Sequence, residues 1–515
     1  MPSYLSPGVY VEEVESGSRP IEGVGTSVAA FVGFAQKGPF DEPTLITNWS
    51  QYVSTFGDFV DGTYLATSVY GFFSNGGGIC YVVRIGDGSS ASGDGETGEL
   101  APGAEVQVGP YAVKPRPGVA GEISVEVTAA EGDDPPSDTF QLIVRRDGQV
   151  AETYPSVTTK RSKENVATRV NAKSELIEVR EPGRGAAPAR PEPQTVTLAP
   201  AAPADPAAGG AGALAPEVYV GDADSRTGLG GLEAVEDITM IAVPDLMSAY
   251  QRGLLDLESV IAVQQGVISH CELMGDRVAI LDPPPGLSAQ QARSWRTDRA
   301  NFDSKYATLY YPWISVADPA SGRPSLVPPS GHIAGVWARN DDTRGVHKAP
   351  ANEVVRGAVA LQTQLTKGEH DLLNPIGLNC IRAFPGRGIR VWGARTLASD
   401  PAWRYVNVRR LFNYLEESIL AGTQWVVFEP NDDALWARVR RTVSAFLVNE
   451  WRKGSLFGLT PDEAFYVKCD RETNPPESID AGQVVCEIGV APVKPAEFVV
   501  FRLAQLTGGT GGIDE

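Results

Sequence analysis

The side chains that could carry acid–base or metal chemistry are few and scattered along the 515 residues. The four histidines form no HExxH motif, and none has a cysteine at metal-ligand spacing: they are His270, His332, His347 and His370. The sequence also lacks the GxSxG motif of a serine nucleophile and the GxxxxGK(S/T) loop that binds phosphates. We therefore expect no catalytic residue, no cofactor and no metal, and the chain is predicted not to be an enzyme.

One enzymatic alternative stays open. Asp282 follows a predicted strand, a position where α/β enzymes often place a catalytic acid, and His347 in a polar loop would be the base. The prolines at 283–285 favour a turn at Asp282 instead. No metal cage is recognisable in the acidic doublets at 133–134, 341–342 and 432–433. An α/β enzyme or ligand-binding protein is therefore the alternative function rather than the favoured one.

The five cysteines are odd in number and far apart in sequence, at Cys80, Cys271, Cys380, Cys469 and Cys486. A CxxC motif is therefore impossible, which excludes a zinc ribbon and a thioredoxin-like redox protein. A disulfide framework is also not expected in a chain this long, so the cysteines are predicted to be reduced core thiols of a cytosolic protein.

The net charge of the chain restricts the kinds of molecule that it can bind. Lys and Arg number 44 against 64 Asp and Glu, a formal charge of −20, which argues against nucleic acid and anionic membrane surfaces. The first residues have no basic region followed by an apolar one, and no stretch reaches the ~18–20 apolar residues of a membrane helix. We expect cytoplasmic assembly without membrane insertion, and release from the cell, if any, by lysis.

Hydrophobic patterning predicts a discontinuous α/β domain over 25–85 and 217–395. Strands and helices alternate there, which indicates a largely parallel sheet. The predicted strands are 26–34, 79–83, 238–244, 277–281 and 306–311, and the predicted helices are 64–73, 251–274 and 289–299. Between them, 86–216 is predicted to be an inserted outer β-domain with an Ala/Pro-rich flexible tract.

The rest of the chain is predicted to form a C-terminal α/β domain over 396–496. Two helices, 404–421 and 432–452, flank a predicted strand at 425–428, and further strands are predicted at 465–469 and 484–490. Residues 1–24 and 497–515 are expected to be terminal arms, since prolines and glycines interrupt the first and a Gly-rich tail ends the second.

Each arm carries a β-prone segment without an obvious hairpin partner. These segments are Val9, Tyr10 and Val11 at the start, and Phe498, Val499, Val500, Phe501, Arg502 and Leu503 at the end. Such strands pair either within their own chain or with a sheet edge of another chain, and the sequence leaves both open.

A basic cluster lies on the helix predicted at 432–452. Its members are Arg438, Arg440 and Arg441. On a chain of charge −20 this cluster would suit an acidic partner, or it is a solvated face balanced by acids of the same subunit.

Several long motifs, in order, resemble the contractile tail sheath family of phage tails, R-type pyocins and phage-like injection systems. They are PGVYVEEV (7–14), GFAQKGP (33–39), NPIGLNCIRAFPGRGIRVWGARTL (374–397), RYVNVRRLFNYLEESI (404–419), QWVVFEPNDDALWARVRRTV (424–443) and NPPESIDAGQVVCEIGVAPVKPAEFVVFRL (474–503). The resemblance covers roughly 1–85 and 220–505, and the insertion matches nothing recognisable.

This resemblance implies a structural subunit that polymerises as stacked hexameric rings around an inner tube and contracts to drive the tube through an envelope. Baseplate and terminal cap proteins would be further partners. The terminal arms would add strands to a neighbour's sheet built near 465–469 and 484–490, and the arginine-bearing helix would face the tube. A non-contractile shell protein is a further alternative, and the choice between phage tail, pyocin and injection system stays open, with a lean to the last.

Overall fold

The computed structural model describes residues 20–86, 214–317 and 322–502, together with parts of the segment 106–198. The chain divides into two compact units. One joins Met1–Ile85 to Ala213–Glu515, and the other is Gly86–Gly212.

An eight-stranded sheet is the centre of the first unit. Neighbouring strands run in the order β18-β17-β13-β12-β11-β1-β3-β2, and all pair in parallel except the antiparallel edge strands β2 and β18. Their bounds are β1 Val28–Gly33, β2 Thr44–Ile46, β3 Ile79–Arg84, β11 Met240–Ala242, β12 Val278–Leu281, β13 Ala307–Tyr311, β17 Leu378–Phe384 and β18 Gly388–Val391. The predicted mixed α/β fold with a largely parallel sheet is confirmed.

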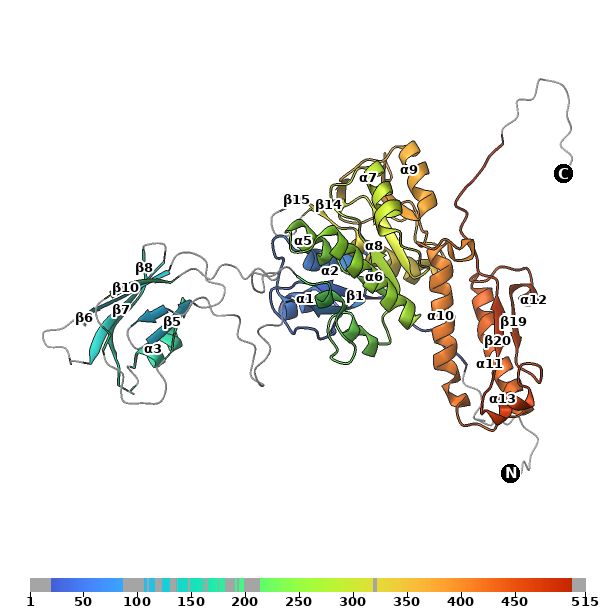
Figure 1. The fold of residues 1–515 in the computed structure, drawn as a ribbon, viewed down its shortest axis with the longest axis horizontal. Helices are drawn as coiled ribbons and strands as arrows, with labels where there is room; N and C mark the ends of the chain where they lie inside the picture. Colours follow the sequence, from blue (N-terminus) through green and yellow to red (C-terminus); the bar gives the residue numbers. More distant parts are fainter. Residues whose placement is uncertain are drawn as a thin grey trace, which may run out of the picture. The chain divides into compact units, whose positions relative to one another are not determined.

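Helices cover the sheet because its central strands are apolar on both faces. Ala29 and Phe31 of β1 pack in the core with α2 and α8, while the intervening Ala30 is buried as well. Helices α2 and α8 contact each other closely (Figure 1). The helices are α1 Trp49–Phe56, α2 Leu65–Asn75, α4 Glu217–Val220, α5 Asp245–Gln251, α6 Leu257–Met274, α7 Ala289–Ser294, α8 Ser330–Arg344 and α9 Lys367–Leu373. A small antiparallel sheet of β14 Ile314–Ala317, β15 Pro324–Val327 and β16 Ala358–Leu361 accompanies them.

The helix predicted over 251–274 is shorter than expected. Gly253 adopts φ 71°, and Asp256 accepts a hydrogen bond from the Ser259 amide as the N-cap of α6. The positive φ and the new cap separate α5 from α6.

The C-terminal layer consists of two long helices and a β-hairpin that share one apolar core. Helix α10 is Val406–Thr423, α11 is Asp433–Arg452, β19 is Phe465–Lys468 and β20 is Glu487–Val490; short helices α12 Pro461–Ala464 and α13 Pro476–Asp480 accompany them. Figure 1 shows α10 and α11 side by side, with the hairpin next to α11.

The strand predicted at 425–428 is wrong. Residues Gln424–Val426 form a 3-10 turn, and Phe428 is fully exposed with φ 66°. This run connects two neighbouring helices, so the chain must turn there, and its apolar side chains enter no sheet.

The second unit is rich in β-structure and has its own core. A four-stranded antiparallel sheet runs β10-β6-β7-β8, and a three-stranded sheet runs β4-β5-β9. The bounds are β4 Val106–Val108, β5 Tyr111–Pro115, β6 Ile123–Ala129, β7 Thr139–Arg146, β8 Gln149–Thr158, α3 Val166–Lys173, β9 Ile177–Arg180 and β10 Gln194–Leu198.

Candidate assembly interface

Glu497 fixes the point at which the C-terminal arm leaves the fold. Its carboxylate accepts hydrogen bonds from Arg395 Nε and Nη2 at 2.9 and 2.6 Å, from Asn374 Nδ2 at 2.7 Å and from the Tyr405 hydroxyl at 3.0 Å. Burial opposes ionisation of this carboxyl, but the bonds from Arg395 and Asn374 outweigh it and hold the pKa of Glu497 below its ordinary value. The arm therefore starts from a charged, fully bonded anchor.

Four large apolar side chains follow the anchor and have almost no cover. Phe498, Val499, Val500 and Phe501 are 75%, 69%, 77% and 84% exposed. Residues 498–502 join no strand of the described chain, whereas a strand was predicted there. Leu503, like Val9, Tyr10 and Val11 of the N-terminal arm, lies outside the described residues. Contiguous exposed apolar side chains of this kind are typical of binding surfaces.

The β19–β20 hairpin has strand edges that another segment could join. Its two strands pair antiparallel with each other and with no third named strand in the parts of the chain that the structure describes. Tyr466 lies opposite Gly489, where an added Cβ would fall 2.1 Å from the tyrosine ring, so any larger residue there would have to displace the ring. A two-stranded hairpin is marginal alone, and this one relies on α10 and α11 for its core.

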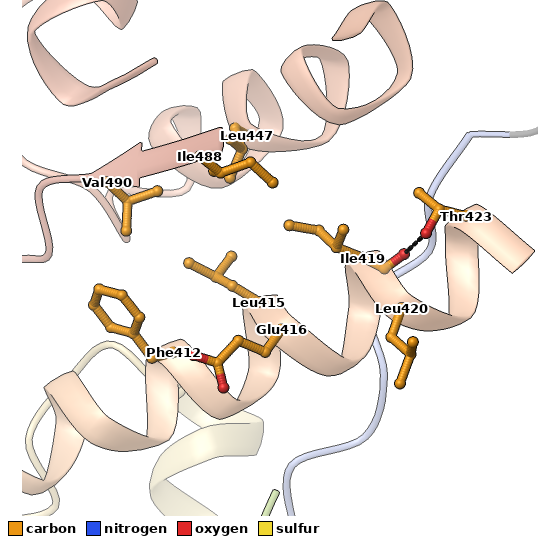
Figure 2. Close-up of a pocket in the computed structure, with 9 residues that line it drawn as sticks. All are labelled: Phe412, Leu415, Glu416, Ile419, Leu420, Thr423, Leu447, Ile488 and Val490. Atoms are coloured by element: carbon orange, nitrogen blue, oxygen red, sulfur yellow. Dashed lines mark hydrogen bonds between the residues drawn. The ribbon is translucent and has the colours of Figure 1, made fainter. Parts of the chain in front are cut away.

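An apolar groove of about 410 Å³ opens beside this hairpin. In Figure 2, side chains of α10 face Ile488 and Val490 of β20, with Leu447 of α11 beside them. The lining residues are Phe412, Leu415, Glu416, Ile419, Leu420, Thr423, Leu447, Ile488 and Val490. Glu416 is bonded to Arg409, and Thr423 to the Ile419 carbonyl, so the remaining lining is hydrocarbon.

The three predicted tube-facing arginines are not equivalent. Arg438 donates to Glu429 at 2.6 Å and lies 4.3 Å from the centre of the Trp425 ring. Arg440 donates to the Cys469 carbonyl at 3.3 Å and Arg441 to the Ala437 carbonyl at 3.3 Å, and both are exposed. Arg438 is balanced by an acid of its own chain, whereas Arg440 and Arg441 remain accessible on α11.

The N-terminal segment is held on α10 by contacts that the sequence did not reveal. Arg410 forms an ion pair with Asp341 at 2.6 Å, with both side chains 3% exposed, and donates to the Thr26 carbonyl at 2.8 Å. Val24 donates its amide to the Ser418 hydroxyl at 3.1 Å. The arginine doublet in the motif RYVNVRRLF is the only sequence feature that hints at this ion pair. Asp341, the partner of Arg410, lies 69 residues away.

Asp282 and His347, the two residues of the enzymatic alternative, have different hydrogen-bond partners in the structure. Asp282 accepts from the Ser330 amide at 2.9 Å and the Ser330 hydroxyl at 2.5 Å, and burial raises its pKa to about 7. His347 lies with Nδ1 3.3 Å from the Ser455 hydroxyl. Asp282 and His347 share no partner, and the described residues contain no group of three or more side chains that could hold a metal.

Family comparisons agree with the C-terminal half of this architecture. The model of the phage tail sheath protein central domain matches residues 231–397, and that of the phage tail sheath C-terminal domain matches residues 398–505. Together they span more than half of the chain. The chain belongs to the phage tail sheath family.

Full-length and partial relatives carry the same description. The tail sheath protein of Burkholderia phage BcepMu is 24% identical over 96% of this chain and 95% of its own length. That of Vibrio phage KVP40 is 28% identical over 43% of this chain, which spans only 35% of the phage protein.

Solved sheath structures share the fold. The PVC sheath of an extracellular contractile injection system in its contracted state has a TM-score of 0.57 at 23% identity, covering 98% of this chain and 99% of that one. The contracted helical sheath of the anti-feeding prophage has a TM-score of 0.57 at 24% identity, covering 98% and 100%. Proteins of the tail sheath family are structural, so the enzymatic alternative is rejected.

No helix in the described ranges is long and apolar enough to cross a bilayer.

Proposed function

We propose that this sheath protein polymerises as stacked hexameric rings around an inner tube and contracts to drive the tube through a target envelope. A baseplate and a terminal cap would complete the particle. Two structural neighbours are a contracted helical sheath and a baseplate in its contracted state, which supports this assignment.

The observation that carries the proposal is the exposed apolar run on an anchored arm. In an extended strand, Phe498 and Val500 face one side and Val499 and Phe501 the other. A strand of this kind gains main-chain hydrogen bonds and burial together when it joins a sheet edge of another copy. Residues 9–11 and 498–503 are the proposed inter-subunit strands.

The proposed acceptor is the β19–β20 hairpin of another copy. Its strand edges supply main-chain donors and acceptors, and the apolar groove beside β20 would receive one row of arm side chains. Main-chain pairing of this kind survives rotation of rigid domains, so neighbouring copies stay linked while their lateral contacts change.

A contractile sheath subunit also implies a tube-facing surface, an outer domain and a compartment of assembly. Arg440 and Arg441 would face an acidic surface of the tube, 86–216 would decorate the outside, and assembly would take place in the bacterial cytoplasm. Domain borders at 395–396 and 496–497 would separate the α/β domain, the C-terminal domain and the arm.

Electron microscopy of the purified protein tests the assembly. Wild-type chain is expected to form wide helical tubes, whereas Phe498→Ser/Val500→Ser is expected to stay folded and form none. The matched control is Leu273→Ser, because Leu273 is 72% exposed on α6 but lies off the arm. Tubes from the arm variant would reject the arm assignment. A single ring geometry before and after triggering would indicate a static shell instead.

A further inference from the structure

Two cysteines, Cys469 and Cys486, face each other at the end of the β19–β20 hairpin. The ladder pairs Phe465 with Val490 and continues to Lys468 opposite Glu487. One step further along the same register, Cys469 falls opposite Cys486, and the two thiols are close enough for each to shift the pKa of the other. All five cysteines are free thiols, but Cys486 is only partly buried, whereas the sequence predicted five core thiols.

The surroundings hold the pair in place. Asn474 accepts from the Val485 amide at 2.7 Å and donates to the Val485 carbonyl at 3.0 Å, which fixes the chain next to Cys486. The Asn474 amide also lies 4.0 Å from the Cys469 sulfur. On the other strand, Arg440 donates to the Cys469 carbonyl at 3.3 Å. Both backbones are thus fixed by side chains outside the hairpin ladder.

Directly opposed residues of an antiparallel pair have Cα atoms about 4.5–5.5 Å apart. A disulfide needs roughly 4.4–6.8 Å between the same atoms, so a pair that continues the ladder by one step would have the required spacing. The other three cysteines differ, because Cys80, Cys271 and Cys380 are buried in the α/β core on β3, α6 and β17.

We propose that Cys469 and Cys486 are an oxidisable pair that closes into an intrachain disulfide when the protein meets a low-molecular-weight disulfide such as oxidised glutathione. The partly exposed Cys486 is the entry point, and the buried Cys469 resolves the intermediate.

The exchange balances in two steps. The Cys486 thiolate attacks one sulfur of glutathione disulfide, forming a mixed disulfide and releasing one glutathione thiolate. The Cys469 thiolate then attacks the Cys486 sulfur and displaces the second glutathione. The two protein thiols are oxidised, the glutathione disulfide is reduced, and the two thiol protons end on the two glutathione molecules.

Burial raises the pKa of Cys486 to about 12, so the reactive thiolate is scarce near neutral pH. Below that pKa the thiolate fraction grows about tenfold per pH unit, and the closure rate is expected to rise with it. Closure is therefore expected to be slow at neutral pH.

The bond would link the two strands of the proposed arm acceptor. Its biological use rests on the proposed function: a sheath assembled in a reducing cell and later released would harden its acceptor hairpin after release. The bond itself depends only on the fold of one chain, so the chemical test below stands apart from any failure of polymerisation.

The test uses the full chain with glutathione disulfide at pH 8 under native conditions, followed by alkylation in denaturant and trypsin mapping. Trypsin cleaves after Lys468 and Arg471, so the two cysteines fall in different peptides and their bond is read directly. We expect the peptides holding Cys469 and Cys486 to be joined, while Cys80, Cys271 and Cys380 are fully alkylated.

The matched variant is Cys486→Ser, in which Cys469 is expected to be alkylated and the joined peptide to be missing. Cys380→Ser serves as the control that should keep the bond. If either variant fails to fold, the map of the wild-type chain still decides. Full alkylation of all five wild-type cysteines, a link between other cysteines, or a link found only between two chains would overturn the proposal.

Discussion

Arg395 donates to both carboxylate oxygens of Glu497, at 2.9 and 2.6 Å, and so holds the last charged residue before the exposed arm. Arg395 follows β18 in the α/β part of the main unit, whereas Glu497 lies beyond β20. The arm thus originates on the α/β part of the fold rather than on the hairpin that precedes it.

Replacing Glu497 with Gln is expected to release the arm root. The change removes the charge from a bidentate pair with limited solvent access, and we expect a local loss of about 1–3 kcal/mol. Hydrogen exchange at the bonded amides of residues 493–497 would measure it, with Glu463→Gln as a control because Glu463 is an exposed glutamate on α12. Unchanged protection in Glu497→Gln would contradict the anchor.

The same anchor should weaken in acid. The pKa of Glu497 is lower in the folded chain than in the unfolded one, so its stabilising effect is present above the ordinary glutamate range. The effect is lost as the pH falls through the folded pKa. Exchange at residues 493–497 in the wild-type chain should therefore rise at low pH more than in Glu497→Gln, after correction for the intrinsic rate.

Asp341→Asn is expected to destabilise the main unit by about 3–5 kcal/mol, because it leaves the buried Arg410 without its counter-charge. The matched control is Asp342→Asn, since Asp342 is exposed and lies next in sequence. Urea unfolding followed by tryptophan fluorescence compares the two. Equal midpoints for the variants would show that the pair contributes nothing.

Asp245 should make stability fall as the pH rises. Its carboxylate accepts from the amides of Phe34, Tyr64 and Leu65, yet burial raises its pKa to about 7. A raised pKa means that the folded chain holds a proton that the unfolded chain has lost, so stability declines between about pH 4 and 7. Asp245→Asn should be less stable at every pH but show a smaller decline, by about one proton. An identical pH slope in urea midpoints would refute this.

Charge reversal at Arg441 is expected to weaken binding to the tube protein without changing stability, since Arg441 is exposed and its only described contact is the Ala437 carbonyl. Arg438→Glu is the contrasting variant, because it breaks the Glu429 pair and the Trp425 contact and should lower stability. Co-sedimentation with the tube protein and thermal melting separate the two effects. Normal co-assembly of Arg441→Glu would remove Arg441 from the tube contact.

The sequence predicted most of the sheet and the long helices because their apolar spacing is set locally. It failed at 425–428, where an apolar run looks like a strand but forms a turn between helices, and no local pattern reveals that exposure. The Glu497 anchor and the Arg410 pair were also missed, because charged partners 102 and 69 residues apart leave no periodic signal. The Cys469 and Cys486 pairing depended on the hairpin register, which only the folded chain defines.

The position of Arg410 has a mechanical consequence. Arg410 belongs to α10. Its guanidinium donates to the Thr26 carbonyl, at the root of the N-terminal arm, and to Asp341 on α8. A force applied to that arm would reach the sheet layer and the helix pair at the same buried point. Under load, the two layers would be displaced together rather than pulled apart.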